Sequence, residues 1–329
     1  MIADATRWRD PVPPQRADAA RPRWSVMIPT YRCERFVAQA LRSVLDQDLG
    51  PRFMQIEVVD DCSADGVEAV VRDMGGDRVS FYAQPRNVGH IANFHTCLTR
   101  ARGDIVHLLH ADDFVRPGFY AALQRGFDAD PDVGAAFSRS AYVDADGRET
   151  DVVPAESEIA GVLPRALQRL ATEQRIMTPS IAVRRSVYEY LGGFDRRLSC
   201  AEDWEMWVRI AARYRIWYEP ESLACYRRHS DSNTGRHVRS GADAAFNLAA
   251  IRIFEAYLPA DEASALVDRA RRTYAGSALK SARRLLEAGD IGGFQAQALA
   301  AWRLSPSAPT AMGVLRALCR GWRTHAGSA

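Results

Sequence analysis

The sequence lacks the features that mark membrane-spanning, secreted and nucleic-acid-binding proteins. No apolar run approaches the roughly 20 residues of a transmembrane helix. Residues 1–22 are rich in Pro, Arg and Ala and hold no apolar core, so we expect a disordered leader there and not a secretory signal. Lys and Arg number 43 against 41 Asp and Glu, a balance that gives no reason to expect nucleic acid as a partner.

Cysteine motifs and the dinucleotide fingerprint are missing as well. The six cysteines stand at positions 33, 62, 97, 200, 225 and 319, and no two form C-x-x-C, which argues against a zinc site and a disulfide framework. Reduced thiols in a cytoplasmic protein are the simplest interpretation. No G-x-G-x-x-G follows the first expected strand, so nothing indicates a dinucleotide-binding fold.

The sequence does contain a regular alternation of apolar and amphipathic segments. Its 329 residues are 47% hydrophobic, which is enough for a full core and a smaller second unit. The expected strands are 24–28, 56–59, 79–82 and 105–109, and the helices between them 36–45, 67–71 and 91–100. This order predicts an α/β fold with a mostly parallel sheet flanked by helices. Further short strands are expected at 133–137, 141–143, 181–183, 216–218 and 224–226.

The composition changes beyond about residue 238, where Ala, Leu and Arg dominate and no strand is evident. Helices are expected near 240–257, 261–288, 290–303 and 309–321. The sequence thus predicts a leader over 1–22, a sheet domain over 23–237 and a C-terminal helical extension over 238–329. Arginines of the extension fit a solvated helical face, with contact to an anionic membrane surface as the alternative.

The stretch from Asp104 to Asp113 carries the clearest functional signal. It reads D-I-V-H-L-L-H-A-D-D, which is an apolar strand that ends in two adjacent carboxylates. Ligands bind at the carboxyl ends of strands in open α/β sheets. Asp112 and Asp113 can therefore hold a hard divalent cation there, and such a cation can hold a diphosphate.

Two other expected strands end in polar loops. Asp60 and Asp61 follow the second strand and can accept hydrogen bonds from a nucleotide base or ribose, or can form an Asx turn. Asp65 fits a helix cap. In the next loop Asn87 and Gly89 can approach a ligand through the backbone, or can simply form a turn before a helix.

The segment from Trp24 to about Thr234 resembles the family-2 glycosyltransferases, which have the GT-A fold. The matching pieces are V-M-I-P-T-Y at 26–31, V-V-D-D-C-S-A-D at 58–65, R-N-V-G at 86–89, H-A-D-D at 110–113, L-G-G-F-D at 191–195, A-E-D-W at 201–204 and Y-R-R-H at 226–229. The resemblance implies inverting transfer of a sugar from a nucleotide-diphosphate donor to a hydroxyl acceptor, in surface polysaccharide or glycolipid assembly. It does not cover the C-terminal helices.

The resemblance also assigns roles to single residues. It implies donor binding by Pro29, Thr30, Tyr31, Asp60, Asp61, Asn87, Gly89 and Ala111, and binding of Mn²⁺ or Mg²⁺ by Asp112, Asp113 and His229. Trp204 and Thr178 are expected to face a saccharide or lipid-linked saccharide acceptor. Arg227 and Arg228 could serve the diphosphate charge. The family's metal motif is D-x-D, and here His110 takes its first position, which leaves the role of His110 open.

Two neighbouring carboxylates in A-E-D-W receive different roles. Glu202 lies three residues after Ser199, which fits a capping box. Asp203 matches the family's general base, which takes the proton of the acceptor hydroxyl as it attacks. The alternative for Asp203 is a carboxylate that interacts with the helix dipole.

Two other functions compete with sugar transfer. The His110 departure motivates a non-catalytic subunit that binds a nucleotide sugar or supports assembly. A nucleotidyltransferase is the third candidate, but A-E-D-W and the absence of a Gly-rich, Lys-bearing first loop speak against it. We expect a cytoplasmic protein, with peripheral contact to the inner face of the membrane as an option. The sugar, base, acceptor, linkage and oligomeric state stay open.

Overall fold

The computed structural model describes residues 6–15, 21–229 and 233–326, and its contacts divide the chain into two compact units. The first unit consists of Met1–Ala166, Arg175–Arg197 and Arg213–Arg228. The second consists of Leu167–Gln174, Leu198–Ala212 and His229–Ala329. The second unit therefore includes two segments from inside the region 23–237, as well as the C-terminal helices.

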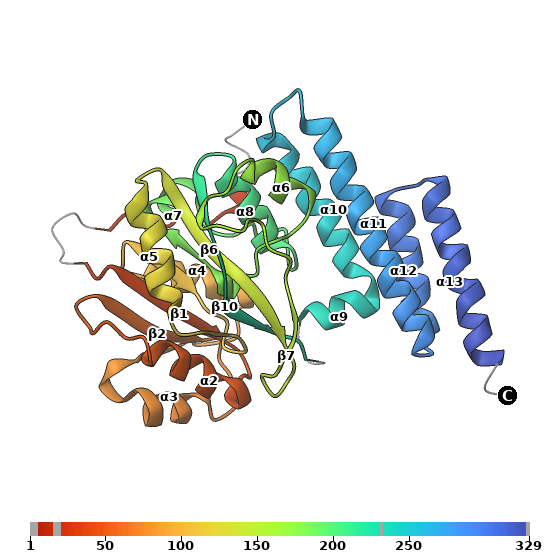
Figure 1. The fold of residues 1–329 in the computed structure, drawn as a ribbon. Coiled ribbons are helices and arrows are strands. Elements are labelled where there is room, and N and C mark those ends of the chain that lie inside the picture. The colour runs from red at the N-terminus through yellow and green to blue at the C-terminus, as the bar shows by residue number, and fades with distance from the viewer. Residues whose placement is uncertain (1–5, 16–20, 230–232, 327–329) are drawn as a thin grey trace. The chain divides into compact units, whose positions relative to one another are not determined.

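The first unit is built on a mixed β-sheet (Figure 1). Its strands are β1 (Trp24–Thr30), β2 (Met54–Asp60), β3 (Ser80–Ala83), β4 (Ile105–Leu108), β5 (Phe114–Val115), β6 (Val133–Val143), β7 (Glu149–Val152), β8 (Gly161–Val162), β9 (Ile181–Arg184) and β10 (Arg215–Arg227). The order is β3-β2-β1-β4-β9-β6-β10-β5, with β7 paired to β6 and β8 to β10. The first four strands are parallel, as the βαβ pattern predicts, and β9 joins them antiparallel.

Helices cover both faces of this sheet. They are α2 (Glu34–Leu45), α3 (Val67–Gly75), α4 (His90–Arg100), α5 (Phe119–Ala129) and α7 (Arg185–Leu191). Alternate β1 residues Trp24, Val26 and Ile28 belong to one core with the apolar stripes of α2, α3 and α5. The Ser25 hydroxyl faces the other side, where it accepts the backbone N–H of Gly103, so the period of two along β1 separates the two faces.

Two long strands replace pairs of short ones, so the expected breaks at 138–140 and 219–223 are wrong. In β6, Ser138 and Ser140 are buried within a strand that pairs on both sides. In β10, the register shifts between Glu219 and Ala224, and this irregularity accommodates Pro220 without ending the strand. Polar residues interrupted the apolar pattern in both places, whereas the backbone ladder continues.

Residues 6–15 are ordered, which corrects the expected disorder in that part of the leader. Val12 is buried, and the backbone of Arg9 bridges to Asp195. The Asp195 carboxylate is buried and pairs with the guanidinium groups of Arg197 and Arg9, at 2.6 and 3.5 Å. Burial alone would raise the pKa of Asp195, but hydrogen bonds and charge from Arg197, helped by Arg9, lower it. Leader residues 1–5 and 16–20 lie outside the described residues.

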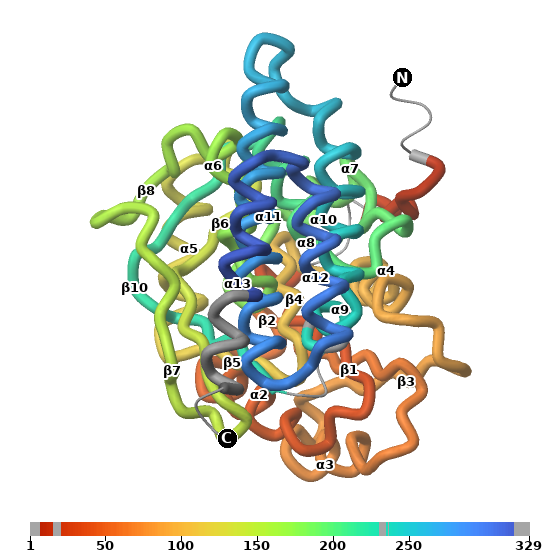
Figure 2. The backbone as a smooth tube through the Cα atoms, turned by 90° about the vertical axis from the view of Figure 1, so that its right-hand side faces the viewer, coloured from red at the N-terminus to blue at the C-terminus, as the bar shows by residue number. Residues whose placement is uncertain are grey.

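The described parts of the second unit contain helices and the loops that connect them, and no strand. Its helices are α6 (Ala166–Thr172, whose first residue lies in the first unit), α8 (Glu202–Ala211), α9 (Asn233–Ser240), α10 (Ala242–Phe254), α11 (Ala263–Glu287), α12 (Ile291–Leu304) and α13 (Ala308–Ala326). The four predicted C-terminal helices are confirmed, and α9 is additional. Small residues such as Ala275, Ala278 and Ala301 form the contact between α11 and α12, which lie side by side (Figures 1 and 2). None of the described helices is both long and apolar enough to cross a membrane.

A histidine is buried in β4, within the stretch that ends in the two aspartates. His107 has no exposed surface; its Nε2 lies 3.0 Å from the carbonyl oxygen of Pro179 and its Nδ1 lies 3.2 Å from the Tyr120 hydroxyl. Because the carbonyl can only accept, Nε2 carries the proton and the Tyr120 hydroxyl donates to Nδ1. Burial lowers the pKa of His107 from 6.5 to about 4, so the imidazole is neutral in the folded protein at neutral pH.

We expect His107 to make the fold sensitive to acid. The unfolded chain takes up a proton on this residue near pH 6.5 and the folded chain only near pH 4, so stability is lost as pH falls through that window. The difference amounts to roughly 3 kcal/mol. Urea unfolding at pH 7 and pH 5 should show a smaller pH dependence for His107→Phe than for the wild type. A pH dependence of His107→Phe equal to that of the wild type would contradict the assignment.

Candidate functional site

The loops that follow β1, β2 and β4 meet at one edge of the sheet in the first unit. Thr30 pairs with Asp60 in the parallel register, and the Asp61 N–H donates to the Thr30 carbonyl at 2.9 Å. The Ala111 N–H reaches the carbonyl of Pro29 at 3.4 Å. The structure therefore brings together three loops that are distant in the sequence, as expected for parallel strands.

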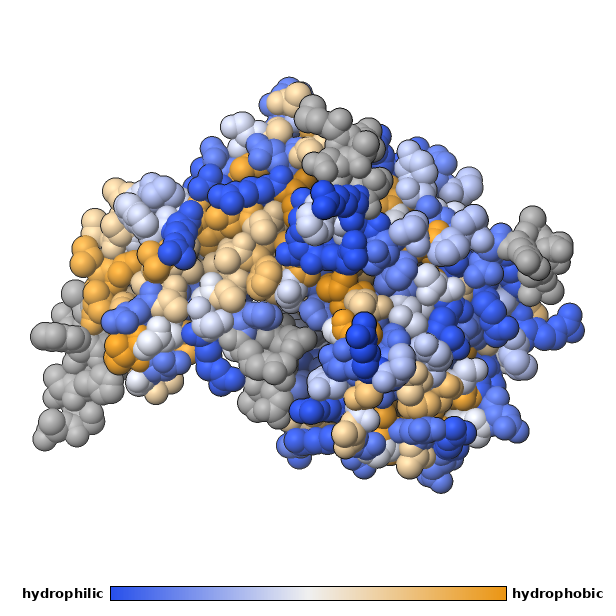
Figure 3. Space-filling model, turned by 180° about the vertical axis from the view of Figure 1, so that it is seen from behind, coloured by the Kyte–Doolittle hydropathy of each residue, from blue (hydrophilic) through white to orange (hydrophobic). Residues whose placement is uncertain are grey.

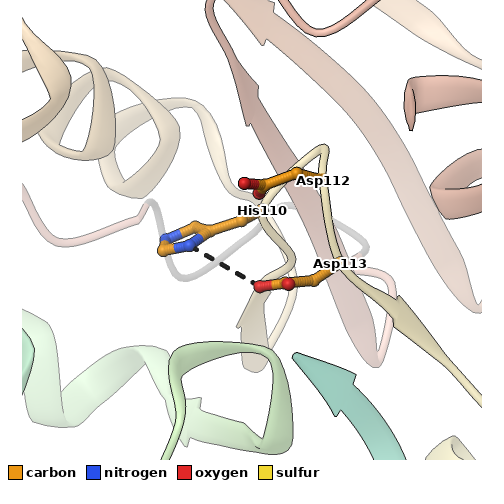
Figure 4. A group of neighbouring side chains, drawn as sticks. All are labelled: His110, Asp112 and Asp113. Atoms are coloured by element: carbon orange, nitrogen blue, oxygen red, sulfur yellow. Dashed lines mark ion pairs between the residues drawn. The ribbon is translucent and has the colours of Figure 1, made fainter. Parts of the chain in front are cut away.

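Three potential metal ligands lie together on the loop after β4. His110, Asp112 and Asp113 each offer one ligand atom, and these atoms all lie within 4.8 Å of one another (Figure 4). The Nδ1 atom of His110 is 3.9 Å from Oδ2 of Asp113. One imidazole and two carboxylates suit Mn²⁺, and the carboxylates alone suit Mg²⁺. His229, the third predicted ligand, belongs to the second unit, so its role stays a prediction.

The two aspartates have different surroundings. Asp113 is buried, and its Oδ1 accepts the backbone N–H of Arg227 at 2.8 Å. Burial, followed by the neighbouring charge of Asp112, raises the pKa of Asp113 well above its usual range. Asp112 is half-buried. Asp113 is thus held by the fold, while Asp112 is the more accessible carboxylate.

Arg227 shapes this loop from the end of β10. Its Nε donates to the Asp112 carbonyl at 2.7 Å, and its terminal nitrogens donate to Gln39 Oε1 at 2.6 Å and to the carbonyls of Asp144 and Ala145, both at 3.0 Å. Its guanidinium also lies 4.8 Å from the centre of the Phe36 ring. These contacts commit Arg227 to the protein, so the expectation that it serves the diphosphate is wrong for this residue.

Arg228, the next residue along, is exposed. Its guanidinium lies 3.4 Å from the centre of the Tyr142 ring, a cation–π contact at the surface. A role for Arg228 toward a diphosphate stays a prediction.

An aromatic stack orients His110. Its imidazole lies nearly parallel to the Phe94 ring, with centroids 5.1 Å apart and an interplanar angle of 17°. Phe194, from the L-G-G-F-D piece, packs against Phe94 with its centroid at 5.4 Å and 60° between the rings. This contact holds the imidazole beside Asp113. No motif in the sequence singles out Phe94 as a support for the cluster.

The two carboxylates at the end of β2, Asp60 and Asp61, are buried and bind the protein's own backbone. Asp60 accepts the N–H of Ser63 at 2.7 Å and its hydroxyl at 2.6 Å, which is the Asx turn that the sequence left open. Asp61 accepts the N–H groups of Val88 and Gly89 at 2.7 and 2.9 Å. Burial raises the pKa of Asp61 although these bonds oppose the rise. The two residues therefore shape the loops, and direct contact with a nucleotide stays a prediction.

The other residues predicted to bind the donor differ in accessibility. Asn87 donates its side-chain amide to the Asp61 carbonyl at 3.1 Å. Gly89 has a φ of +86°, which a residue with a side chain rarely adopts, and no atom lies within 4 Å of where a Cβ would stand. Pro29, Thr30 and Ala111 are buried, whereas Tyr31 is 43% exposed and can stack on a planar ligand.

Asp203 lies in the first turn of α8, in the second unit. Its Oδ2 accepts the side-chain amide of Gln174 at 2.6 Å, and its Oδ1 accepts the N–H of Trp204 at 2.7 Å. The helix begins at Glu202, and its N-cap is Ala201 in the left-handed conformation, without a side-chain cap. The predicted capping box between Ser199 and Glu202 is therefore wrong.

The two residues predicted to face the acceptor are both buried. Trp204 has no exposed surface, donates its Nε1–H to the Leu170 carbonyl at 2.6 Å and packs against Phe254 and Tyr274. The structure thus places Trp204 in the core of the second unit and contradicts its prediction as a platform for a sugar. Thr178 is 4% exposed, in the first unit, and its acceptor role stays a prediction.

Comparison with known proteins supports a single family. The model of glycosyl transferase family 2 matches residues 25–192, and the chain therefore belongs to that family of sugar-transferring enzymes. The uncharacterized protein MT1568 of Mycobacterium tuberculosis is 31% identical over 236 residues, covering 66% of this chain and 70% of the relative. The succinoglycan biosynthesis protein ExoO of Rhizobium meliloti is 27% identical over 228 residues, covering 66% and 61%.

Solved structures share the GT-A fold at low sequence identity. S. aureus TarS residues 1–349 superpose with a TM-score of 0.61 at 15% identity, covering 93% of this chain and 92% of TarS. The mannosyltransferase PcManGT from Pyrobaculum calidifontis, solved with GDP-Man and Mn²⁺, gives a TM-score of 0.57 at 22% identity, covering 98% and 88%. The predicted fold class, a GT-A-type sheet flanked by helices with C-terminal helices, is confirmed.

Proposed function

We propose that this glycosyltransferase moves a sugar from a nucleotide-diphosphate donor to a hydroxyl acceptor, with inversion at the anomeric carbon and with Mn²⁺ or Mg²⁺ bound. The observation that carries the proposal is the cluster of His110, Asp112 and Asp113 at the carboxyl end of β4. Structural neighbours support the donor class: S. aureus TarS is solved in complex with UDP-GlcNAc, and PcManGT in complex with GDP-Man.

In this proposal the first unit binds the donor. Asp112 is the principal metal ligand because it is more accessible than Asp113, and His110 adds a nitrogen ligand. When bound, a divalent cation neutralises the charge that develops on the diphosphate as it leaves. Tyr31 stacks on the nucleotide base, and Asp61 holds the backbone of the 87–89 loop ready for the donor. Pro29, Thr30, Asp60 and Ala111 line the same edge of the sheet.

Asp203 takes the proton in this proposal. Inversion follows from a single in-line displacement, in which the acceptor hydroxyl loses its proton as it attacks the anomeric carbon. A carboxylate suits that task because it accepts the proton without forming a covalent intermediate. Hydrogen bonds from Gln174 and Trp204 stabilise Asp203 in its charged form, which is the form a base needs.

We further propose an acceptor at a membrane surface, in polysaccharide or glycolipid assembly. The relative ExoO, a succinoglycan biosynthesis protein, supports this context. No Asp or Glu follows Asp290 in the sequence, and four arginines do. Exposed apolar side chains on α12 and α13 include Leu299, Trp302 and Leu315. Hydrophobic residues are visible on the face of the molecule drawn in Figure 3. A segment that combines basic residues with exposed apolar side chains suits anionic lipids.

A panel of nucleotide sugars tests the proposed activity. The protein is heated with UDP-, GDP- and dTDP-linked sugars, with Mn²⁺ or with EDTA, and release of the nucleoside diphosphate is measured with saccharide acceptors. We expect one base to raise the melting temperature in Mn²⁺ and much less in EDTA, and the same donor to be turned over. Binding without any turnover would favour a non-catalytic subunit, and no binding at all would refute the proposal.

A further inference from the structure

Gln174 links Asp203 to a tyrosine of the C-terminal helices. All three residues belong to the second unit. The Gln174 side-chain amide donates to Asp203 Oδ2 at 2.6 Å, and the Gln174 backbone N–H donates to the hydroxyl of Tyr274, on α11, at 3.1 Å. Gln174 is therefore fixed at both its backbone and its side chain.

The tyrosine is well placed to hold this segment. Burial raises the pKa of Tyr274, so its hydroxyl keeps its proton and accepts the N–H of Gln174 through a lone pair. The Tyr274 ring lies 4.7 Å from the Trp204 ring, and Trp204 binds the carbonyl of Leu170, four residues before Gln174. Together with the bond between Gln174 and Asp203, these contacts tie segment 170–174 to α8 at two places and to α11 at one.

The chemistry of the Gln174 contact suits a base. A carboxylate that accepts two N–H groups, here from Gln174 and Trp204, is restricted to one orientation. The amide of Gln174 is neutral, so it orients the carboxylate without the strong stabilisation that an Arg or Lys would give to its charge. If the contact only held segment 170–174 against α8, the proton affinity of Asp203 would not matter for the reaction.

We propose that Gln174 is a positioning residue for Asp203 and that Tyr274 holds Gln174 in place. The inference rests on the proposed role of Asp203 as the base. It means that the C-terminal helices take part in the reaction by supporting the base, beyond any role in contacting a partner. Loss of the Gln174 amide should then change how the rate depends on pH as well as how large it is.

The test is the pH profile of kcat for Gln174→Leu, Gln174→Glu and Tyr274→Phe. We expect Gln174→Leu to lower kcat roughly ten- to a hundred-fold near neutral pH and to move the acidic limb up by about one pH unit, because the charged base loses a donor. Gln174→Glu places a second carboxylate beside Asp203 and should move that limb further. Tyr274→Phe should cause a smaller change in the same direction. The donor Kd of all three variants should stay within about twofold of wild type, because the base acts on the acceptor and does not bind the donor.

Gln168→Leu is the matched control, because Gln168 lies in the same unit and its amide contacts Glu262 at 3.5 Å and not Asp203. It should keep the wild-type profile. If the Gln174 variants lower kcat by the same factor at every pH, and this factor follows their loss of melting temperature, the role of Gln174 is only structural and the inference is overturned. If Asp203→Asn is itself fully active, the base assignment of the proposed function fails; if Asp203→Asn is inactive while the Gln174 variants keep the wild-type profile, only this inference fails.

Discussion

Asp203→Asn is expected to abolish sugar transfer and to leave donor binding intact. The substitution removes the group that takes the acceptor proton, and a general base contributes roughly 10²- to 10⁴-fold to a rate. We therefore expect kcat to fall by at least about 10²-fold at saturating donor and acceptor. Asparagine has the same shape, and its side-chain oxygen can still accept the N–H of Trp204 at the position of Oδ1. Calorimetric donor Kd should stay within about twofold of wild type.

The neighbouring carboxylate provides the control for this experiment. Glu202 is the first residue of α8, so Glu202→Gln changes the charge at the same helix terminus. If Asp203 acts only through the helix dipole, both variants should have similar, small effects, because such a charge contributes about 0.3–1 kcal/mol. Wild-type turnover in Asp203→Asn would remove the base assignment.

Asp112→Asn is expected to weaken donor binding that depends on Mn²⁺. Substitution of residues that only support metal ligands commonly reduces affinity 10- to 100-fold, so loss of a direct carboxylate ligand should reduce it by at least about 100-fold. Binding in EDTA should not change. Calorimetry with a nucleoside diphosphate, with and without Mn²⁺, measures both quantities.

The melting temperature of Asp112→Asn distinguishes the loss of a metal ligand from misfolding. The charge of Asp112 contributes to the raised pKa of the buried Asp113. Removal of that charge relieves the repulsion, so the melting temperature of Asp112→Asn should equal or exceed that of wild type. Asp146→Asn, at an exposed position in the same unit, is the control and should bind donor normally. An unchanged Mn²⁺ effect in Asp112→Asn would exclude Asp112 as the main ligand.

The features that the sequence predicted well are set by interactions between residues close together in the chain. The apolar runs of β1, β2 and β4 alternate with amphipathic helices, and this local pattern was enough for the α/β fold. The same applies to the C-terminal helices. One local prediction is wrong: the N-cap of α3 is Gly66, without a side-chain cap, and Asp65 lies one residue earlier, where it accepts the N–H groups of Glu34 and Val67.

The parts that were missed depend on contacts between distant residues. Arg227 binds the Asp112 carbonyl 115 positions away, and Gln174 binds Asp203 29 positions away. No periodicity or motif encodes such pairs. Trp204 shows the opposite error: its place beside Asp203 suggested a surface role, whereas its partners Phe254 and Tyr274 come from later helices and bury it. Leader residues 6–15 are ordered for a similar reason, since Asp195 lies far from Arg9 in the sequence.

The composition of the second unit has a consequence for engineering this enzyme. Its C-terminal helices share a core with segments 167–174 and 198–212, which lie within the catalytic part of the sequence. A chimera that exchanges only residues 229–329 with those of a relative would therefore separate Trp204 and Gln174 from their partners Phe254 and Tyr274. These helices can be exchanged only if all three segments move together, as one module that is discontinuous in the sequence.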